Sequence, residues 1–534
     1  MAAAFYFCTQ KQGFHEDEYY TYYSTARTNG FYIEDGQWMD RELYRNEFVV
    51  LPGQRFQYGL VKLVQSWDVH PPMYYWVFHT VASFMSGIFS KWIGLSVNLF
   101  FHSINIILLT YLAGLIAGRD SKLSLFAALF WGLSPAVMSG VVFIRMYEML
   151  TTFVLLCGIL HVHAVRKNEK KLPVIRYLVP MAAVTYLGFL TQYYYFIFLF
   201  YLAIAFCIWL LWRDRNIWNC LRYGVGQGFA FFLAYLTYPS FPGQMFRGQR
   251  GAQATKSFFD WSNTFERIRF FYDLMNRYVF GHLLTVFLLL IFILAAVYRW
   301  SRHKGKVIMN KRSGSSLLSE HTAGFCIGYW MLVFASVGYF LTVSKTALLL
   351  GDTSIRYQLP VYGVVVLLIF TAISKLWQVI AVSCTENGKF VKWMKYKRYM
   401  EAAAVFLCLA AIVPGHWKDG VVFLYPEDRE QTAFANDCAV QSIPVVYLYR
   451  PGEEWCVWDV TNELMAYPEV CFVSAENDGT IKDGRIRSAD SLVVYLAQGG
   501  DERVWIEGIL DSNKNLTDYR HMFVEKYCDV YYFY

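Results

Sequence analysis

The stretch that decides the fold is Trp67-Asp68-Val69-His70-Pro71-Pro72-Met73-Tyr74-Tyr75-Trp76. It ends a polar segment, Thr9 to Ser66, that carries Glu16-Asp17-Glu18 near its start. After it, apolar segments follow one another to about Pro414. An apolar run of about 20 residues is long enough to cross a bilayer core. The order therefore predicts an acidic loop, a proline corner and then a helical membrane domain.

Composition supports a protein that crosses the membrane many times. Of the 534 residues, 56% are hydrophobic and only 17% are charged, and the mean hydropathy is +0.29. The net charge of +7 does not indicate nucleic acid, because Lys and Arg gather in short loops between apolar runs. The eleven cysteines are scattered without a Cys-x-x-Cys pair, so we expect neither a zinc nor an iron–sulfur site.

We expect ten spans, near Ile93–Ala117, Leu123–Phe143, Met149–Val165, Leu178–Leu190, Tyr195–Trp212, Val225–Tyr238, Val279–Tyr298, Gly324–Thr342, Tyr357–Ala372 and Ala402–Pro414. Basic residues lie in alternate loops, at 119–122, 166–171, 213–215, 299–312 and 389–398. By the positive-inside bias these loops are cytoplasmic. Met73–Ile88 is then an amphipathic helix on the membrane surface. Counting it as a span would put the basic loops outside.

The two ends of the chain lead to further expectations. Met1 to Cys8 is too short to cross the membrane, and we expect it to be the end of a first span; the alternative is an N-terminus that lies on the surface. After Pro414, strand-like runs at 444–449, 470–474, 491–496 and 530–534 alternate with helix-like segments, which indicates a small α/β domain. The expected division is 1–12, 13–91, 92–414 and 415–534.

This topology places one set of groups outside the membrane: the acidic loop, the turn at Arg145, the loops at 239–278 and 344–356, and the C-terminal domain. Cys438, Cys456, Cys471 and Cys528 would then lie where disulfides can form, although free thiols stay open. Charged groups near a membrane usually have a partner or a task. One carboxylate and two arginines at span ends suit the transfer of a sugar from a lipid phosphate. The carboxylate would activate a hydroxyl, and the arginines would stabilise the phosphate.

Three motifs resemble the protein O-mannosyltransferase family and its bacterial relatives, GT-C glycosyltransferases that include the lipid A aminoarabinose transferases. The first is Asp17-Glu18 followed by Asp68-Val69-His70-Pro71-Pro72. The second is Arg145-Met146-Tyr147 within Phe143–Leu150, and the third is Arg356-Tyr357-Gln358-Leu359-Pro360. The resemblance covers roughly Gly13 to Pro414.

The resemblance implies a role for each matching residue. Asp17 would be the general base, and Glu18 would orient the acceptor or support the loop. Arg145 and Arg356, the latter with Tyr357 beside it, would bind the lipid phosphate. Asp17 could instead be a helix N-cap, and each arginine could be an interfacial anchor.

Two further residues are candidates for substrate binding. His70 either contacts substrate or holds the proline corner, where Asp68 has a stabilising role. Glu148 is the nearest match to an acidic residue that many family members carry on the second external turn. The C-terminal domain does not resemble the β-trefoil of eukaryotic O-mannosyltransferases, which argues against a protein acceptor.

The external loop at 239–278 is basic, although the positive-inside bias would place basic loops in the cytoplasm. Its charge therefore indicates a separate role. We expect Arg247 and Arg250 to lie over the donor site and attract its phosphate. The alternative is an interfacial helix that faces lipid with an apolar side made of Phe265, Ile268, Tyr272 and Met275.

The sequence thus predicts a polytopic α-helical membrane protein of GT-C type with a small C-terminal extracytoplasmic α/β domain. Its expected activity is that of a hexosyl- or mannosyl-type glycosyltransferase in the cell membrane. The partners are a polyprenyl-phosphate-linked sugar, membrane lipid and an unidentified acceptor, with no nucleic acid. No metal-ligand motif is present, but a divalent metal stays open, since GT-C enzymes differ in this. The alternatives are a transporter or flippase of lipid-linked saccharides, and a non-catalytic protein whose tail binds cell-wall polymer.

Overall fold

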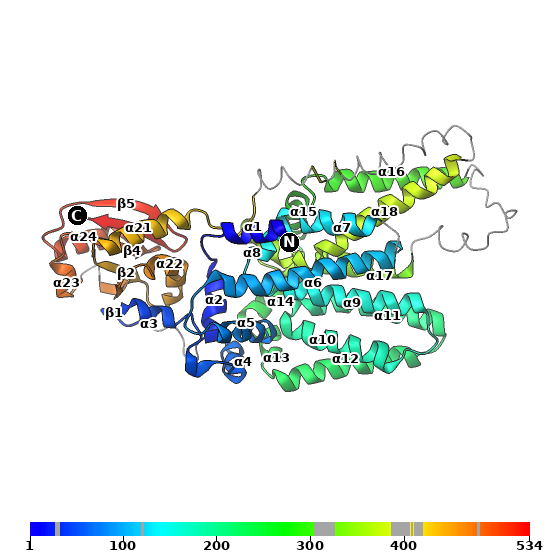
Figure 1. The fold of residues 1–534 in the computed structure, drawn as a ribbon, viewed down its shortest axis with the longest axis horizontal. Helices are drawn as coiled ribbons and strands as arrows, with labels where there is room; N and C mark the ends of the chain where they lie inside the picture. Colours follow the sequence, from blue (N-terminus) through cyan, green and yellow to red (C-terminus); the bar gives the residue numbers. More distant parts are fainter. Residues whose placement is uncertain are drawn as a thin grey trace.

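The computed structural model describes residues 1–26, 33–118, 122–303, 326–385, 406, 409–410, 420–477 and 481–534. The molecule is elongated, with a bundle of long helices at one end and a small sheet domain at the other (Figure 1). The predicted architecture, a helical membrane domain followed by an α/β domain, is confirmed. Helix α2, in the polar loop before the first long helix, lies between these two parts (Figure 1).

The polar loop and the segments around it form short helices. They are α1 (Ala2–Gln10), α2 (Glu16–Ala26), α3 (Arg41–Asn46), η1 (Pro52–Gln54), α4 (Tyr58–Ser66) and α5 (Met73–Phe84). Helix α5 has 12 residues, too few to cross a bilayer core of about 30 Å. This length agrees with the prediction that Met73–Ile88 is not a span.

Six helices are long and apolar enough to cross a membrane: α6 (Lys91–Ala117), α9 (Tyr147–Lys167), η2 with α10 (Val174–Thr191), α11 (Tyr194–Asp214), α17 (Ile327–Thr346) and α18 (Leu359–Thr385, within it Leu359–Trp377). The pair α7 (Leu123–Gly132) and α8 (Pro135–Val142) could count as a seventh, but it bends by 59°. Pro135 explains this bend, because Ser134 before it is extended and cannot continue a helix. The span predicted near Leu123–Phe143 thus corresponds to this bent pair, which is either one broken span or a re-entrant loop.

The other predicted spans have different outcomes. Helix α12 (Trp218–Thr237) does not qualify as a span, and α16 (Leu284–His303) is apolar only over Leu284–Trp300. The described part of the chain thus holds six or seven candidate spans, fewer than the ten expected. The span at Ala402–Pro414 and most of the basic loops at 299–312 and 389–398 lie outside the described residues.

The loop after α12 also folds into helices: α13 (Phe241–Phe246), α14 (Gln249–Phe259) and α15 (Thr264–Tyr278). The apolar side predicted for α15 does not form one exposed face, because Phe265 is exposed while Met275 is buried. Arg267 is also buried and donates from Nε to the carbonyl of Ser344 at 2.9 Å. This helix therefore packs on the bundle on its Arg267 side.

The sheet domain holds a six-stranded sheet in the order β1-β3-β2-β4-β6-β5. Its strands are β1 (Gln37–Asp40), β2 (Val445–Tyr449), β3 (Glu469–Ser474), β4 (Leu492–Ala497), β5 (Tyr519–Val524) and β6 (Cys528–Phe533). Strands β3, β2 and β4 are parallel, and β1, β5 and β6 pair antiparallel. The four strands expected from sequence are present. Strand β1 comes from the first loop and joins the domain at the edge beside β3.

The helices of the sheet domain are α21 (Asp428–Val440), η4 (Glu454–Val460), α22 (Thr461–Leu464), η5 (Ala475–Asn477), α23 (Gly484–Arg487) and α24 (Glu502–Ser512). One sheet face packs with Trp505, Ile506 and Ile509 of α24. The other face shares a core with the first loop, through contacts such as Tyr44 with Phe472 at 6.3 Å between ring centroids. Cys438, Cys456, Cys471 and Cys528 are buried free thiols.

Candidate active site

The start of helix α2 is capped by His15 and Glu18 rather than by the side chain of Asp17. His15 precedes the helix, and its Nδ1 accepts the backbone N–H of Asp17 at 3.1 Å. In return Glu18 Oε2 accepts the backbone N–H of His15 at 2.6 Å. This reciprocal arrangement is that of a capping box, with histidine in place of the usual hydroxyl residue. Because His15 and Glu18 satisfy the helix start, the carboxylate of Asp17 does not act as the N-cap.

Two buried arginines converge on Asp17 from distant parts of the chain. Arg356 Nη1 lies 3.2 Å from Asp17 Oδ2, and Arg145 Nη2 lies 4.0 Å from Asp17 Oδ1. Arg356 comes from η3 (Gly351–Tyr357), and Arg145 from the turn between α8 and α9. Their side chains are only 4% and 3% exposed, whereas Asp17 is 34% exposed. We call Asp17, Arg145 and Arg356 the arginine site; the sequence predicted all three.

The two arginines differ in how well their donors are satisfied. Arg145 Nη1 donates to the hydroxyl of Tyr75 at 2.9 Å, and to the Asp17 carbonyl and Thr21 Oγ1 at 3.1 Å each. The contacts of Arg356 are longer: 3.3 Å to the Tyr357 hydroxyl, besides the ion pair with Asp17. Its buried Nε has no hydrogen-bond partner among the described residues. Arg356 therefore keeps donor capacity that Arg145 has already used.

The electrostatics of the arginine site keep Asp17 ionised. Burial by itself raises the pKa of Asp17, but the positive charges of Arg356 and Arg145 lower it by more, so the pKa lies well below its usual range. Burial lowers the pKa of His15 to about 3, which leaves this ring neutral. A carboxylate held in this way is a weak base as long as both arginines face it.

The proline corner reaches the arginine site through His70. Its Nδ1 lies 2.7 Å from Asp68 Oδ2, and its Nε2 lies 3.3 Å from Arg145 Nη2. Burial raises the pKa of Asp68, and the adjacent His70 lowers it by more. The structure thus brings His70 to the site and places Asp68 behind it.

Glu18 lies beside Asp17 in sequence but in the protein interior. Its side chain is 0% exposed and forms an ion pair with the equally buried Lys11 at 2.9 Å. Its Oε1 also accepts the backbone N–H of Ile144 at 2.7 Å. Gly94 on α6 permits this packing, because a Cβ there would lie 2.0 Å from Ile144 Cγ2. Glu18 and Lys11 therefore fix the turn that carries Arg145.

The contacts of Glu148 are with helix α6 rather than with the arginine site. It is 3% exposed, accepts from Asn105 Nδ2 at 2.9 Å and lies 3.5 Å from His102 Nδ1. Both partners are on α6. In the described part of the chain, Glu148 makes no hydrogen bond or ion pair with Asp17 or either arginine, and its partners are polar groups between helices.

Arg247 and Arg250 are exposed on the helices after α12. Neither makes a hydrogen bond or an ion pair with the described residues, although the charge of Arg250 acts on the Tyr194 hydroxyl, whose ring contacts Tyr357 at 6.0 Å. The neighbouring Gln244, which sequence reasoning missed, donates from Nε2 to the Asp68 carbonyl at 2.5 Å. It ties this loop to the proline corner.

A second missed contribution comes from the segment that enters the sheet domain. The ring of Phe423 stacks on Phe143 with centroids 4.0 Å apart, and Phe143 lies under the guanidinium of Arg356 at 5.4 Å. The carbonyl of Phe423 accepts from Lys11 Nζ at 2.7 Å. Nothing in the sequence around Phe423 marks it, because its role arises only when the remote segments meet.

Within the described ranges, no group of three or more His, Cys, Asp or Glu side chains is arranged to hold a metal ion. The cationic groups dominate the arginine site instead. Two guanidinium groups next to a carboxylate form an arrangement that suits the recognition of an anion.

Comparison with known proteins gives few matches. No protein-family model matches the chain, and no curated protein matches it in sequence. Two solved structures are similar, both of ArnT from Cupriavidus metallidurans, a lipid A aminoarabinose transferase with the GT-C fold. ArnT bound to undecaprenyl phosphate has a TM-score of 0.49 at 11% identity and covers 96% of this chain and 95% of its own. Apo ArnT has a TM-score of 0.47 at 11% identity, with 96% of each chain covered.

Proposed function

We propose that this chain is a membrane glycosyltransferase that moves a sugar from a polyprenyl-phosphate carrier to an acceptor hydroxyl. The observation that carries the proposal is the arginine site. A partly exposed carboxylate is held between two guanidinium groups that are almost fully buried. Buried arginines need anionic or hydrogen-bonding partners, and Asp17 is the one ion-pair partner that both share among the described residues.

Arg356 is the proposed contact of the donor phosphate. Its Nε lacks a partner among the described residues and its other contacts are long, whereas a phosphate oxygen can accept charge-assisted hydrogen bonds from a guanidinium. The aromatic rings of Phe143 and Tyr357 flank the guanidinium at 5.4 Å and 5.1 Å, which restricts its movement and excludes water. Tyr357 would orient the bound phosphate through its hydroxyl.

The reaction follows from these positions. The acceptor oxygen forms a bond to the anomeric carbon of the sugar, and the bond from that carbon to the phosphate oxygen breaks. The phosphate leaves with the electron pair and gains one negative charge, which Arg356 stabilises. The proton of the acceptor hydroxyl moves to Asp17.

Donor binding would also change the basicity of Asp17. While Arg356 and Arg145 face Asp17, its pKa is well below its usual range. A phosphate that draws Arg356 away removes the largest charge that lowers this pKa. Asp17 would then become more basic at the moment when donor is present. Arg145, fixed by Tyr75 and Thr21, would stay and orient the carboxylate.

The remaining residues have supporting roles in this proposal. Glu18 positions Arg145 rather than touching substrate, because it is fully buried in the ion pair with Lys11. His70 would contact the acceptor or the sugar from the side of Arg145. Glu148 would stabilise the packing of α6 on α9 through Asn105.

The basic loop is proposed to lie over the donor. Gln244 anchors it to the proline corner, and Arg247 and Arg250 are exposed without a hydrogen-bond or ion-pair partner among the described residues. Changing both to Gln should weaken donor binding several-fold, measured as the dissociation constant of a polyprenyl-phosphate-sugar. Unchanged affinity would rule out this role.

We further propose that the arginine site and the sheet domain are extracytoplasmic. Arg145 lies just before α9, and Arg166 and Lys167 are in its last turn. A helix of this length separates its ends by about 30 Å. Arg166 and Lys167 therefore lie at the end of α9 that is remote from the arginine site. By the positive-inside bias, this basic end is the cytoplasmic one.

The test is sugar release from a panel of radiolabelled polyprenyl-phosphate-sugars in liposomes. Wild type should turn over at least one donor, and Asp17→Asn should lose about 10²–10⁴-fold in rate while still binding donor. Asp40→Asn is the matched control, since the Asp40 side chain is exposed and caps α3 and Asn also caps helices. Movement of donor across the bilayer without sugar release, equal in all three proteins, would contradict the proposal and indicate a flippase.

A further inference from the structure

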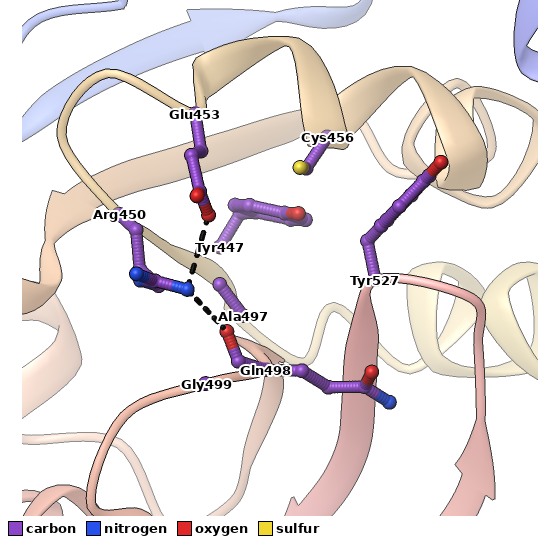
Figure 2. Close-up of a pocket in the computed structure, with 8 residues that line it drawn as sticks. All are labelled: Tyr447, Arg450, Glu453, Cys456, Ala497, Gln498, Gly499 and Tyr527. Carbon is purple, nitrogen blue, oxygen red and sulfur yellow. Dashed lines mark hydrogen bonds and ion pairs between the residues drawn. The ribbon is translucent and has the colours of Figure 1, made fainter. Parts of the chain in front are cut away.

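The sheet domain has a pocket of about 340 Å³ at the end of its two central parallel strands. Figure 2 shows its lining, which includes Arg450 directly after β2 and Gln498 directly after β4. The chain goes from β2 to β3 on one side and returns to β4 on the other side. Ligands of open α/β sheets bind at such a reversal, outside the carboxyl ends of the strands. The volume is also within the range of roughly 300–1,000 Å³ for small-molecule sites.

The lining combines aromatic rings with planar polar groups. Tyr447 and Tyr527 contribute rings, and Arg450, Glu453 and Gln498 contribute hydrogen-bonding side chains (Figure 2). Arg450 Nη1 is held 3.1 Å from Glu453 Oε2 and donates to the carbonyl of Gln498 at 3.2 Å. These contacts hold Arg450 between Glu453 and Gln498. Rings beside donors and acceptors suit a ligand with both apolar faces and hydroxyl groups.

One buried hydroxyl in the pocket lacks a hydrogen-bond partner among the residues that the structure describes. The side chain of Tyr447 is 1% exposed, and its hydroxyl makes no hydrogen bond within the described part of the chain. A buried hydroxyl without a partner destabilises the free protein. Figure 2 shows Tyr447 in the middle of the lining residues, so a ligand in the pocket could supply the missing hydrogen bond.

The charges around the pocket argue against a phosphate or nucleotide. Anions favour a helix N-terminus, but here carboxylates already occupy the N-termini of the two neighbouring helices, η4 and α24. Glu453 and Glu454 stand at the start of η4, and Asp501 and Glu502 at the start of α24. Arg450, which could bind an anion, already pairs with Glu453. A neutral ligand rich in hydroxyl groups fits these surroundings better.

We propose that this pocket binds a neutral saccharide and presents it as the acceptor. The inference rests on the proposed function, because it names the acceptor class of the same reaction. Tyr527 links the two sites: its ring lines the pocket, and its hydroxyl donates to Glu16 Oε2 at 2.9 Å. Glu16 immediately precedes Asp17 on α2. A glycan chain bound in the pocket could therefore extend a hydroxyl toward Asp17.

The experiment is ligand-observed NMR with the full chain in lipid nanodiscs. The probes are methyl glycosides of glucose, galactose, mannose and N-acetylglucosamine and their disaccharides. Tyr447→Phe removes the hydroxyl but loses no internal hydrogen bond, so the fold should be unaffected. Tyr519→Phe is the matched control, since Tyr519 lies on the exposed edge strand β5. A bound glycoside should lose roughly three- to tenfold in affinity in Tyr447→Phe and nothing in Tyr519→Phe.

The outcomes separate the pocket from the reaction. Absence of binding by every glycoside, equal binding by wild type and Tyr447→Phe, or binding only by phosphorylated glycosides would overturn the inference. If wild type releases sugar from its donor while Tyr447→Phe keeps the same acceptor KM, the pocket inference fails and the proposed function stands. If glycosides bind in the pocket but no donor is turned over, the proposed function fails and the pocket remains a saccharide site.

Discussion

Two neighbouring groups of partly buried acids behave in opposite ways. One is Asp17 in the arginine site. The other, the acid-rich seam, is made of Asp428, Asp459 and Glu525, where the sheet domain packs on the first loop. Burial raises the pKa of all three seam acids, with added repulsion from neighbouring carboxylates, to about 7, 6 and 8 respectively. The pKa of Asp17 is instead well below its usual range.

The difference teaches that the arginines, not the burial, set the state of Asp17. Burial alone would raise its pKa, as in the seam, and Arg356 and Arg145 reverse that effect. Among the described residues, the cations that act on the seam are Lys526, which pairs with Glu16, and Lys11, which pairs with Glu18. Asp428 lies so close to Gly13 that a Cβ on Gly13 would be 1.6 Å from its Oδ2. It follows that a ligand which competes for Arg356 would move Asp17 toward the behaviour of the seam acids.

The largest expected effect concerns Glu18, a fully buried acid whose charged partner is Lys11. Glu18→Gln leaves the Lys11 charge buried without a counter-ion, so the free energy of unfolding should fall by about 3–5 kcal/mol. Thermal unfolding in detergent, followed by near-ultraviolet circular dichroism, measures the loss. The double variant Lys11→Met/Glu18→Gln should recover part of it. A single variant as stable as wild type would contradict the role assigned to this pair.

A smaller effect should separate the two arginines. Arg356→Lys keeps the charge but loses the fork geometry that suits a phosphate, so the donor KM should rise by roughly tenfold, about 1.4 kcal/mol. Arg145→Lys should mainly lower kcat, because Arg145 orients Asp17 through several neutral acceptors. Steady-state kinetics of sugar release with varied donor distinguishes these patterns. Equal changes in KM for both variants would remove the distinction.

The smallest effect tests the seam. A carboxyl whose folded pKa is raised binds protons more tightly in the folded state, so stability falls as pH rises from about 4 toward the folded pKa. The melting temperature of the sheet domain should therefore fall between about pH 5 and pH 8. The pKa of Asp17 is lowered in the folded protein, so Asp17 contributes stability that is lost as the pH falls, and this loss is complete only in strong acid. Asp428→Asn should flatten the pH dependence and add on the order of 1 kcal/mol at neutral pH. Asp40→Asn, an exposed control, should leave the pH dependence unchanged.

Much of the arginine site could be predicted from the sequence. Arg145 and Arg356 lie at the ends of apolar runs, where charged residues usually have a task, and Asp17 is marked by the resemblance of the first loop. Alternation of the basic loops placed them at one end of the bundle. The capping role of His15 and the stacking of Phe423 could not be predicted, because they depend on contacts between segments that are remote in sequence.

The sheet was predictable where its strands are fully buried. Strands β2 and β4 are buried at every residue, and parallel central strands have continuous apolar sequences of this kind. Strand β5 is largely exposed and carries Arg520 and His521, as edge strands often carry charge, so its sequence resembles a loop. Strand β1 has four residues and pairs with a strand more than 400 positions away, which no local pattern reveals.

The central claim is that Asp17 and the donor phosphate compete for Arg356. The most direct test is the affinity of undecaprenyl phosphate for three proteins in nanodiscs: wild type, Asp17→Asn and Arg356→Gln. The account predicts opposite signs, with several-fold tighter binding by Asp17→Asn, which removes the competing carboxylate, and weaker binding by Arg356→Gln. Weaker binding by Asp17→Asn would contradict the claim, because it would mean that Asp17 helps to hold the phosphate rather than competing with it.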